Sequence, residues 1–447
     1  MTRWYVFILF FGIVVFPVFG YIDPATGSML FSLLTGAAVT VFFFLKSAYL
    51  KLKYSSPLTI GLKRVLRKET SMDKVMGVSG TKPQFVMYSE GKQYWNVFEP
   101  ILREFDRRGI PCTYYTSGED DPGLSFSSPS ITARYIGTGN RAYRFLNFLE
   151  ADVCLLTTPG LDVFQLKRSP GVSHYAHILH AVTDATLYRL FGLDYFDTVF
   201  LTGPYQVADI RYLEELRNTP RKRLVVVGCT YLDVLTEKVK NLQVERNGKT
   251  VLVAPSWGEN GILRKFGIKL LRPLAETSYH VIIRPHPQSM VAEREVVELL
   301  QKELSAFPHV EWDFERENVR ALAKSDVLIS DFSGIIFDFA FLFGGPILYP
   351  KFEFDFRIYD AGDVRTEPWT FRTLRNIGYA LEEKDFEKIG EILESIRMDP
   401  HRKEYIEQAK KEAYDQPGSA GKRVVEELIK IREEISCTVK QEVNSSR

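Results

Sequence analysis

The sequence predicts an α/β protein in which two doubly wound, Rossmann-like domains follow an apolar amino terminus. The first observation is an alternation of short β-rich runs with helical stretches from about Phe85, which is typical of domains built on parallel sheets. The second is a polar segment that ends in the turn Asn247-Gly248-Lys249, after which a new series of such runs begins. The third is the length of 447 residues, which allows two or three domains.

The first domain is expected over residues 81–240. Each candidate strand there is a short run rich in β-branched, aromatic and other apolar residues, and helical patterns lie between the runs. The expected strands are residues 85–88, 112–115, 152–157, 198–201 and 224–227, and the expected helices include 94–108 and 140–150.

The second domain is expected over residues 249–436 and repeats the alternation. Its expected strands are residues 250–254, 281–284, 310–312, 327–330 and 347–349, its expected helices are 291–304, 319–324 and 335–342, and closing helices are expected at 385–396, 401–414 and 421–435. Ligands of open parallel sheets bind outside the carboxyl ends of the strands. Two such domains that face one another form a cleft for a nucleotide and an acceptor, which suits a transferase.

The amino terminus predicts a membrane anchor over residues 1–54, with apolar stretches at 4–20 and 29–45. Seventeen helical residues span about 26 Å, close to a hydrocarbon core of about 30 Å. Basic residues from Lys46 onward, including those in a linker over 55–80, favour the cytoplasmic face of the cell (inner) membrane for the folded part. Two alternatives stay open: the first stretch also resembles a cleavable secretory signal, and the second would also suit a buried core helix.

The charge distribution argues against nucleic acid as a partner. The formal charge of +1 is the balance of +6 on the first 74 residues and −5 on the remainder, so the folded part is mildly acidic. A protein that binds nucleic acid through its phosphates would show a basic face on its folded part. The four cysteines never form a CxxC pair, which argues against a zinc site or a disulfide framework.

The stretch Ser330-Asp331-Phe332-Ser333-Gly334 joins an expected strand to an apolar helix. Unpaired N–H groups and the dipole at such a helix start favour an anion, and Gly334 would let a phosphate approach closely. We therefore predict a donor-phosphate site at Asp331, Ser333 and Gly334. Asp331 is expected to orient the turn or a donor hydroxyl, because its carboxylate would repel phosphates. The alternative is that Ser333 only caps the helix.

A second candidate site, Arg284-Pro285-His286-Pro287, ends another expected strand. The two prolines fix the backbone around His286, and Arg284 can fork onto phosphate oxygens. His286 would then donate to a phosphate or a leaving group. The alternative is that this histidine is a structural hydrogen bonder, which is common for a lone histidine at a strand end.

A third candidate site holds three histidines at spacing three, His174, His177 and His180. A metal is the less favoured interpretation, because no nearby cysteine or HExxH arrangement completes a ligand set. One histidine acting as general base for a hydroxyl nucleophile fits better, because imidazole titrates near neutral pH. The other two are then packing residues or support the base. No cofactor is predicted.

At these residues the chain resembles the CDP-glycerol glycerophosphotransferase family, which primes and polymerises wall teichoic acids. The family's Tyr-x-x-x-x-His-Gly block corresponds to the stretch from Tyr175 to Ala181, so His180 falls on the family's proposed catalytic base and His177 supports it. Val253-Ala254-Pro255-Ser256-Trp257 resembles the family's Ala-Pro-Thr-Trp, which makes Ser256 a further candidate for donor binding. The other two sites resemble its Lys/Arg-Pro-His-Pro and Thr/Ser-Asp-Tyr-Ser-Ser blocks.

The resemblance implies a GT-B-like architecture that holds CDP-glycerol, or a related CDP-alditol, mainly on the second domain and requires no metal. Four positions depart from the family's pattern. Ala181 stands where the family has glycine, Thr230 and Tyr231 where it has proline and arginine, and Gly334 where it has serine.

Together these features predict a membrane-associated phosphotransferase of cell-envelope polymer synthesis. It would move glycerol phosphate, or another phosphoalditol, to a hydroxyl of a lipid-linked acceptor. His180 would take the hydroxyl proton, while Arg284, His286 and the turn at Ser333 would neutralise the pyrophosphate as CMP departs. Two alternatives are a GT-B glycosyltransferase or epimerase that uses a nucleotide sugar, and a non-catalytic envelope scaffold of the same fold.

Overall fold

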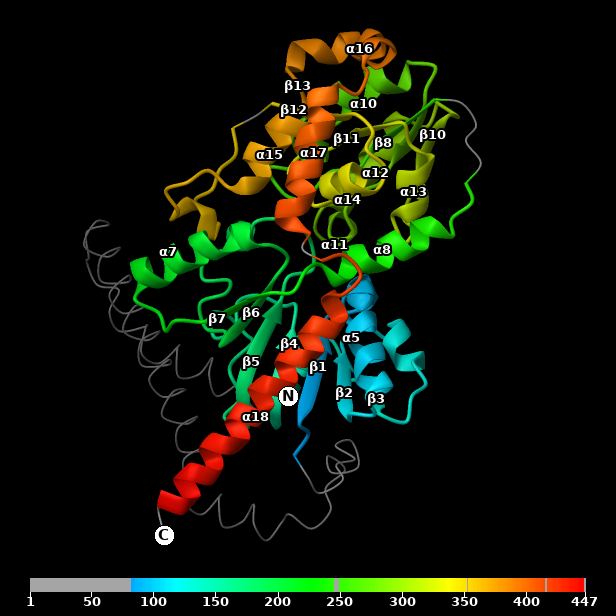
Figure 1. The fold of residues 1–447 in the computed structure, drawn as a ribbon. Helices are drawn as coiled ribbons and strands as arrows, with labels where there is room; N and C mark the ends of the chain where they lie inside the picture. Colours follow the sequence, from blue (N-terminus) through cyan, green and yellow to red (C-terminus); the bar gives the residue numbers. More distant parts are fainter. Residues whose placement is uncertain (1–81, 245–248, 352, 415, 446–447) are drawn as a thin grey trace, which may run out of the picture. The chain divides into compact units, whose positions relative to one another are not determined.

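The computed structural model describes residues 82–447 apart from 245–248, 352, 415 and 446–447 (Figure 1). The predicted anchor over 1–54, with its apolar stretches 4–20 and 29–45, and the basic linker 55–80 lie outside the described residues. Residues 82–447 form one compact unit. Among the helices described in this unit, none combines the length and the apolar character needed to cross a bilayer.

The first sheet is parallel throughout and runs in the order β3-β2-β1-β4-β5-β6-β7 (Figure 1). Its strands are β1 (Phe85–Ser89), β2 (Cys112–Thr116), β3 (Ile131–Tyr135), β4 (Ala151–Leu156), β5 (Val172–Ile178), β6 (Thr198–Leu201) and β7 (Arg223–Val226). The order reverses direction between β1 and β4. Such a switch point opens a crevice at the carboxyl ends of the two strands.

The second sheet repeats this topology in the order β10-β9-β8-β11-β12-β13, again parallel. Its strands are β8 (Thr250–Val253), β9 (His280–Ile283), β10 (Val310–Trp312), β11 (Val327–Ile329), β12 (Ile347–Pro350) and β13 (Tyr379–Leu381). Its switch point lies between β8 and β11. Two doubly wound sheets in tandem are the fold class that the sequence predicts.

Helices accompany both sheets (Figure 1). Those between the strands of the first sheet, and after its last strand, are α5 (Trp95–Arg107), α6 (Asn140–Leu146), α7 (Val207–Arg217) and α8 (Thr230–Lys240). Those between the strands of the second are α9 (Ile262–Lys265), α10 (Ile268–Ala275), α11 (Ser289–Ala292), α12 (Arg294–Glu303), α13 (Val319–Lys324), α14 (Ile335–Leu342) and α15 (Trp369–Ile377). The chain ends in α16 (Ile389–Ser395), α17 (Pro400–Ala413) and α18 (Ala420–Ser445).

Both faces of each sheet are buried, which explains why the strands read as nearly continuous apolar runs. Along β1, Met87 belongs to one core cluster while Val86 and Tyr88 belong to the cluster on the opposite face. Leu252 and Val253 of β8 divide in the same way between the two clusters of the second sheet. Each fully buried side chain of this size contributes about 1.5–3 kcal/mol. The sheets are therefore rigid platforms for the loops at their carboxyl ends.

The predicted boundary of 249–436 places the last helix in the second domain. In the structure this helix belongs to the first domain instead. Helix α18 packs against α5 and β4 of the first sheet. Val424, Val425 and Leu428 are buried in the core cluster of that sheet. The chain therefore crosses back to the first domain after α17, because the apolar stripe of α18 completes one face of the first sheet.

Candidate active site

The switch point of the second sheet is held together by one buried carboxylate. Asp331 follows β11, and its Oδ1 accepts hydrogen bonds from the N–H groups of Ser256, at 2.9 Å, and Ser333, at 3.1 Å. Its Oδ2 accepts from the N–H of Ile262 at 3.2 Å. Burial raises the pKa of Asp331, and the N–H donors oppose that shift. Asp331 therefore shapes the loops after β8 and β11, in agreement with the expectation that it orients the turn, and it is not itself a phosphate ligand.

The start of α14 is open, as a phosphate-binding helix start requires. Ser333, Gly334 and Ile335 are all half-buried. Gly334 occupies the N-cap position, with no side-chain cap hydrogen bond, so the alternative that Ser333 only caps the helix is not what the structure has. The N–H of Ser333 donates to Asp331, and the N–H groups of Ile336 and Phe337 donate to the carbonyls of Ser333 and Gly334. Within the described part of the chain, the N–H groups of Gly334 and Ile335 have no acceptor and are available to an anion.

His286 follows β9, and the backbone fixes one of its ring nitrogens. Its Nδ1 accepts a hydrogen bond from the N–H of Gln288 at 3.1 Å, which leaves the proton of the neutral ring on Nε2. Burial, with smaller contributions from His180 and Arg284, lowers the pKa of His286 to about 4. The titration of His286 therefore depends on an imidazole that comes from the other domain.

Arg284 is the site residue whose predicted role the structure contradicts. Its guanidinium donates to Oδ2 of Asp313 at 2.6 Å and to the carbonyls of Glu315, at 2.7 Å, and Arg316, at 3.3 Å. The side chain is 9% exposed and forms a buried ion pair. A guanidinium engaged in this way cannot also fork onto phosphate oxygens. Arg284 instead fixes the segment after β10 to the end of β9.

The three histidines of the third site take different directions because most of the segment is a strand. Side chains alternate along β5, so His174 and His177 lie on opposite faces of the sheet. His174 Nε2 lies 2.8 Å from the hydroxyl of Thr198, and His177 Nε2 lies 3.2 Å from the hydroxyl of Tyr188. His180 lies two residues beyond the strand end, where its Nδ1 is 3.4 Å from the same Tyr188 hydroxyl. The hydroxyl of Tyr188 thus links the rings of His177 and His180.

His180 is half-buried among aromatic rings. The ring of Tyr94 packs edge-on at 5.2 Å between centroids. Burial lowers the pKa of His180 to about 4, so the imidazole is neutral at pH 7 and can accept a proton. Tyr94 and Tyr188 were not predicted from the sequence, because tyrosines at these positions carry no motif.

The segment after β5 crosses to the second domain and contacts the start of α14. A Cβ added to Gly334 would lie 3.2 Å from the Cβ of Ala181 and 3.4 Å from Cγ2 of Thr183. Asp184 then accepts hydrogen bonds from the N–H groups of Trp369, at 2.7 Å, and Thr370, at 2.6 Å, and so caps α15. The structure thus brings together His180 and the turn at Gly334, which lie about 150 residues apart in the sequence.

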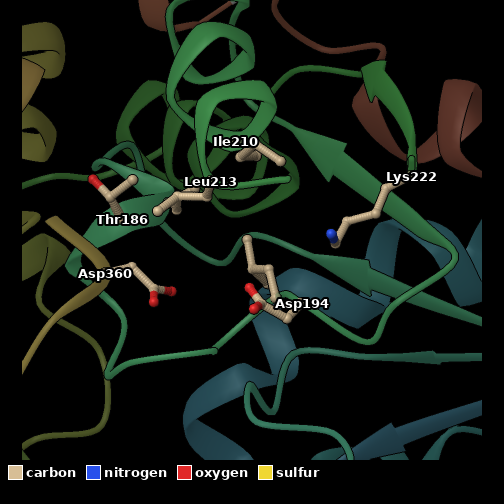
Figure 2. A pocket seen from close by; sticks show the side chains of 8 residues that line it. Thr186, Asp194, Ile210, Leu213, Lys222 and Asp360 are labelled. Atoms are coloured by element: carbon tan, nitrogen blue, oxygen red, sulfur yellow. The ribbon is translucent and has the colours of Figure 1, made fainter. Parts of the chain in front are cut away.

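Figure 2 shows a separate small cavity, with Asp194, Lys222 and Asp360 around it. Its volume of about 10 Å³ suits roughly one water molecule and no substrate. Asp360, from the second domain, accepts a hydrogen bond from Arg217 of α7 at 2.7 Å, and Arg217 also pairs with Asp194. This cavity therefore belongs to a second contact between the domains.

Two parallel sheets, with strand-end loops that meet at neutral imidazoles, are the arrangement of a GT-B-like enzyme. Among solved structures, the wall teichoic acid polymerase TagF with CDPG is similar at 15% identity, with a TM-score of 0.51 over 85% of this chain and 97% of that one. The UDP-GlcNAc 2-epimerase of Neisseria meningitidis, bound to UDP-GlcNAc, is similar at 16% identity, with a TM-score of 0.51 over 78% of this chain and 100% of that one. At these identities the likeness shows the fold alone.

The family comparison adds the class of reaction. Residues 206–426 match the model of the family described as CDP-Glycerol:Poly(glycerophosphate) glycerophosphotransferase. A comparison with curated proteins found no match. The family match supports the resemblance drawn from the motifs. The chain is a transferase enzyme similar to the CDP-glycerol glycerophosphotransferases.

Proposed function

We propose that this enzyme transfers glycerol phosphate, or a related phosphoalditol, from the corresponding CDP-alditol to a hydroxyl of a lipid-linked acceptor during envelope polymer synthesis. The observation that carries the proposal is the contact between the segment after His180 and the start of α14 at Gly334. A proton acceptor and an anion site meet there, as phosphoryl transfer from a nucleotide donor requires. The family match over residues 206–426 supports the choice of donor.

In the proposed reaction, the neutral imidazole of His180 takes the proton of the acceptor hydroxyl. The hydroxyl oxygen forms a bond to the phosphorus that carries the glycerol, and the bond from that phosphorus to the bridging oxygen of CMP breaks. CMP leaves with the electron pair, stabilised by the Nε2 proton of His286 and by the N–H groups at Gly334. The diphosphate of a bound donor would raise the pKa of both imidazoles, because an anion favours their charged forms.

The membrane part of the proposal rests on the amino-terminal sequence. The apolar stretches 4–20 and 29–45 would hold the enzyme at the inner membrane, with its cleft on the cytoplasmic face and close to a lipid-linked acceptor. Cell fractionation of the full chain and of a chain that lacks residues 1–54 tests this point. Recovery of the full chain away from membranes would contradict it.

A panel of donors tests the proposed reaction. The purified enzyme is incubated separately with CDP-glycerol, CDP-ribitol and UDP-sugars, and the released nucleotide is measured by chromatography. Release of CMP from a CDP-alditol is expected. Release of UDP, or epimerisation of a UDP-sugar, would instead establish a nucleotide-sugar enzyme. Binding of a CDP-alditol without turnover on any acceptor would establish the non-catalytic alternative.

A further inference from the structure

The carboxyl ends of β1 and β4 form the switch point of the first sheet, for which the sequence motifs predict no role. Tyr88 of β1 pairs with Leu156 of β4, so the register continued by two residues places Glu90 opposite Thr158. In the second sheet, the matching switch point carries Asp331 and the predicted donor site. Each sheet thus presents a carboxylate at the place where open α/β sheets bind ligands.

Glu90 lies within a group of half-buried aromatic residues that reaches His180. Burial raises the pKa of Tyr94 and Tyr188, and the nearby negative charge of Glu90 raises it further. The same two residues contact His180, through the ring of Tyr94 and the hydroxyl of Tyr188. The end of β5, which carries His180, is two strands from β1, or roughly 10 Å at the spacing of neighbouring strands.

The contacts of Glu90 leave room for a ligand. No ion pair joins Glu90 to a lysine or arginine within the described part of the chain, although the residue is half-buried. Burial raises the pKa of Glu90, and a hydrogen bond from the side chain of Thr158, the residue opposite, acts against that shift. A carboxylate offers about four acceptor positions, so a single threonine hydroxyl leaves it able to accept from hydroxyls of a ligand.

We propose that Glu90 and the adjoining end of β4 form an acceptor subsite that recognises a pair of neighbouring hydroxyls on a polyol. This inference rests on the proposed function and names the chemistry of its acceptor. A carboxylate accepts hydrogen bonds from two hydroxyls at once, and the rings of Tyr94 and Tyr188 suit the C–H faces of a polyol. Glu90 would repel the donor's diphosphate, which places an uncharged polyol end here, with its reacting hydroxyl near His180.

The test compares two soluble acceptors. One is a short oligo(glycerol phosphate) whose last unit carries two neighbouring hydroxyls, and the other ends in a propane-1,3-diol unit that lacks one of them. With CDP-glycerol as donor, the wild-type enzyme is expected to prefer the first acceptor by about tenfold or more in kcat/KM, because a hydrogen bond to a charged group contributes about 1.5–3 kcal/mol. Glu90→Ala should lower this preference below about threefold, because it removes the same interaction.

Three further measurements separate the possible outcomes. Glu90→Gln, which keeps the shape and loses the charge, should fall between the wild type and Glu90→Ala. Glu150→Gln, at an exposed carboxylate beside the amino end of β4, should keep the full preference. Donor affinity, measured by calorimetry, should be the same in all four proteins. If the wild type prefers the oligo(glycerol phosphate) with two neighbouring hydroxyls and Glu90→Ala prefers it equally, the proposed subsite is wrong while the proposed function stands. If the wild type releases no CMP with this oligo(glycerol phosphate), both proposals fail.

Discussion

At the scale of single residues, burial of the imidazoles is the dominant influence on the site. His177 is fully buried, and burial lowers its pKa from the ordinary value near 6.5 to about 3. His180 and His286 shift in the same direction, each to about 4. All three rings therefore enter the reaction, or support it, as neutral groups at pH 7. Their protonation in the free enzyme would need a far more acidic solution.

This burial predicts how the stability of the enzyme depends on pH. Between pH 6.5 and about 4 the unfolded chain protonates His177 and the folded chain does not, so the contribution of this residue to stability falls as the pH falls. His177→Gln removes the titration, so the stability of the wild type relative to this variant should decrease by roughly 2–3 kcal/mol over that range. Urea denaturation at several pH values measures the difference. A difference that stays constant with pH would contradict the assignment.

At the scale of elements, the loops after β8 and β11 depend on Asp331. Its carboxylate accepts hydrogen bonds from three backbone N–H groups and is 1% exposed. Asp331→Ala should lower the free energy of unfolding by roughly 3–5 kcal/mol, because three buried donors lose a charged acceptor. Asp120→Ala, at an exposed carboxylate, is the control and should change stability by less than about 1 kcal/mol. Equal effects of the two substitutions, measured by urea denaturation, would show that Asp331 does not hold the loops.

Elements also show which part of the fold the sequence predicts. The strand β6 and the helices α13 and α14 begin and end where the pattern predicts them, because apolar runs there are bounded by clear polar or turn residues. The strand β5 was not predicted as a strand, since His174 and His177 interrupt its apolar pattern. Its existence explains why these two histidines diverge, which spacing along a sequence does not reveal.

The candidate site could be predicted only where a motif lies on one loop. The turn from Ser330 to Gly334 combines its strand end, carboxylate and helix start in five residues, so its local geometry follows from the sequence. The role of Arg284 could not be predicted, because its partner Asp313 lies on the neighbouring strand end. Glu90 and Asp184 carry no motif, and only the folded chain brings Glu90 to the aromatic residues around His180 and Asp184 to the start of α15.

At the scale of the whole molecule, the two domains meet at Ala181 and Gly334, two small residues that each depart from the pattern of the resembling family. Ala181 has a side chain where the resembling family has glycine, and Gly334 lacks one where that family has serine. The two positions are in contact, because a Cβ at Gly334 would lie 3.2 Å from the Cβ of Ala181. The added methyl group on one domain is thus accommodated by the smaller residue on the other.

A double-mutant cycle across this contact tests the pairing of the domains. Gly334→Ser alone should reduce kcat/KM for CMP release, because the new side chain crowds Ala181. Ala181→Gly in the same chain should restore much of the loss, with a coupling free energy of about 0.5–2 kcal/mol. Additive effects would mean that the two residues do not meet in the working enzyme. Ala142→Gly, at a buried alanine of α6, serves as the control and should give no rescue.

The most direct measurement of the central claim is the rate of CMP release from CDP-glycerol by His180→Ala, made together with calorimetric donor binding. Removal of a general base should slow the reaction by about 10²- to 10⁴-fold, while donor affinity and the melting temperature stay close to those of the wild type. His174→Ala, on the same segment but directed toward Thr198, is the matched control and should retain most of the rate. Turnover by His180→Ala at the wild-type rate would contradict the account.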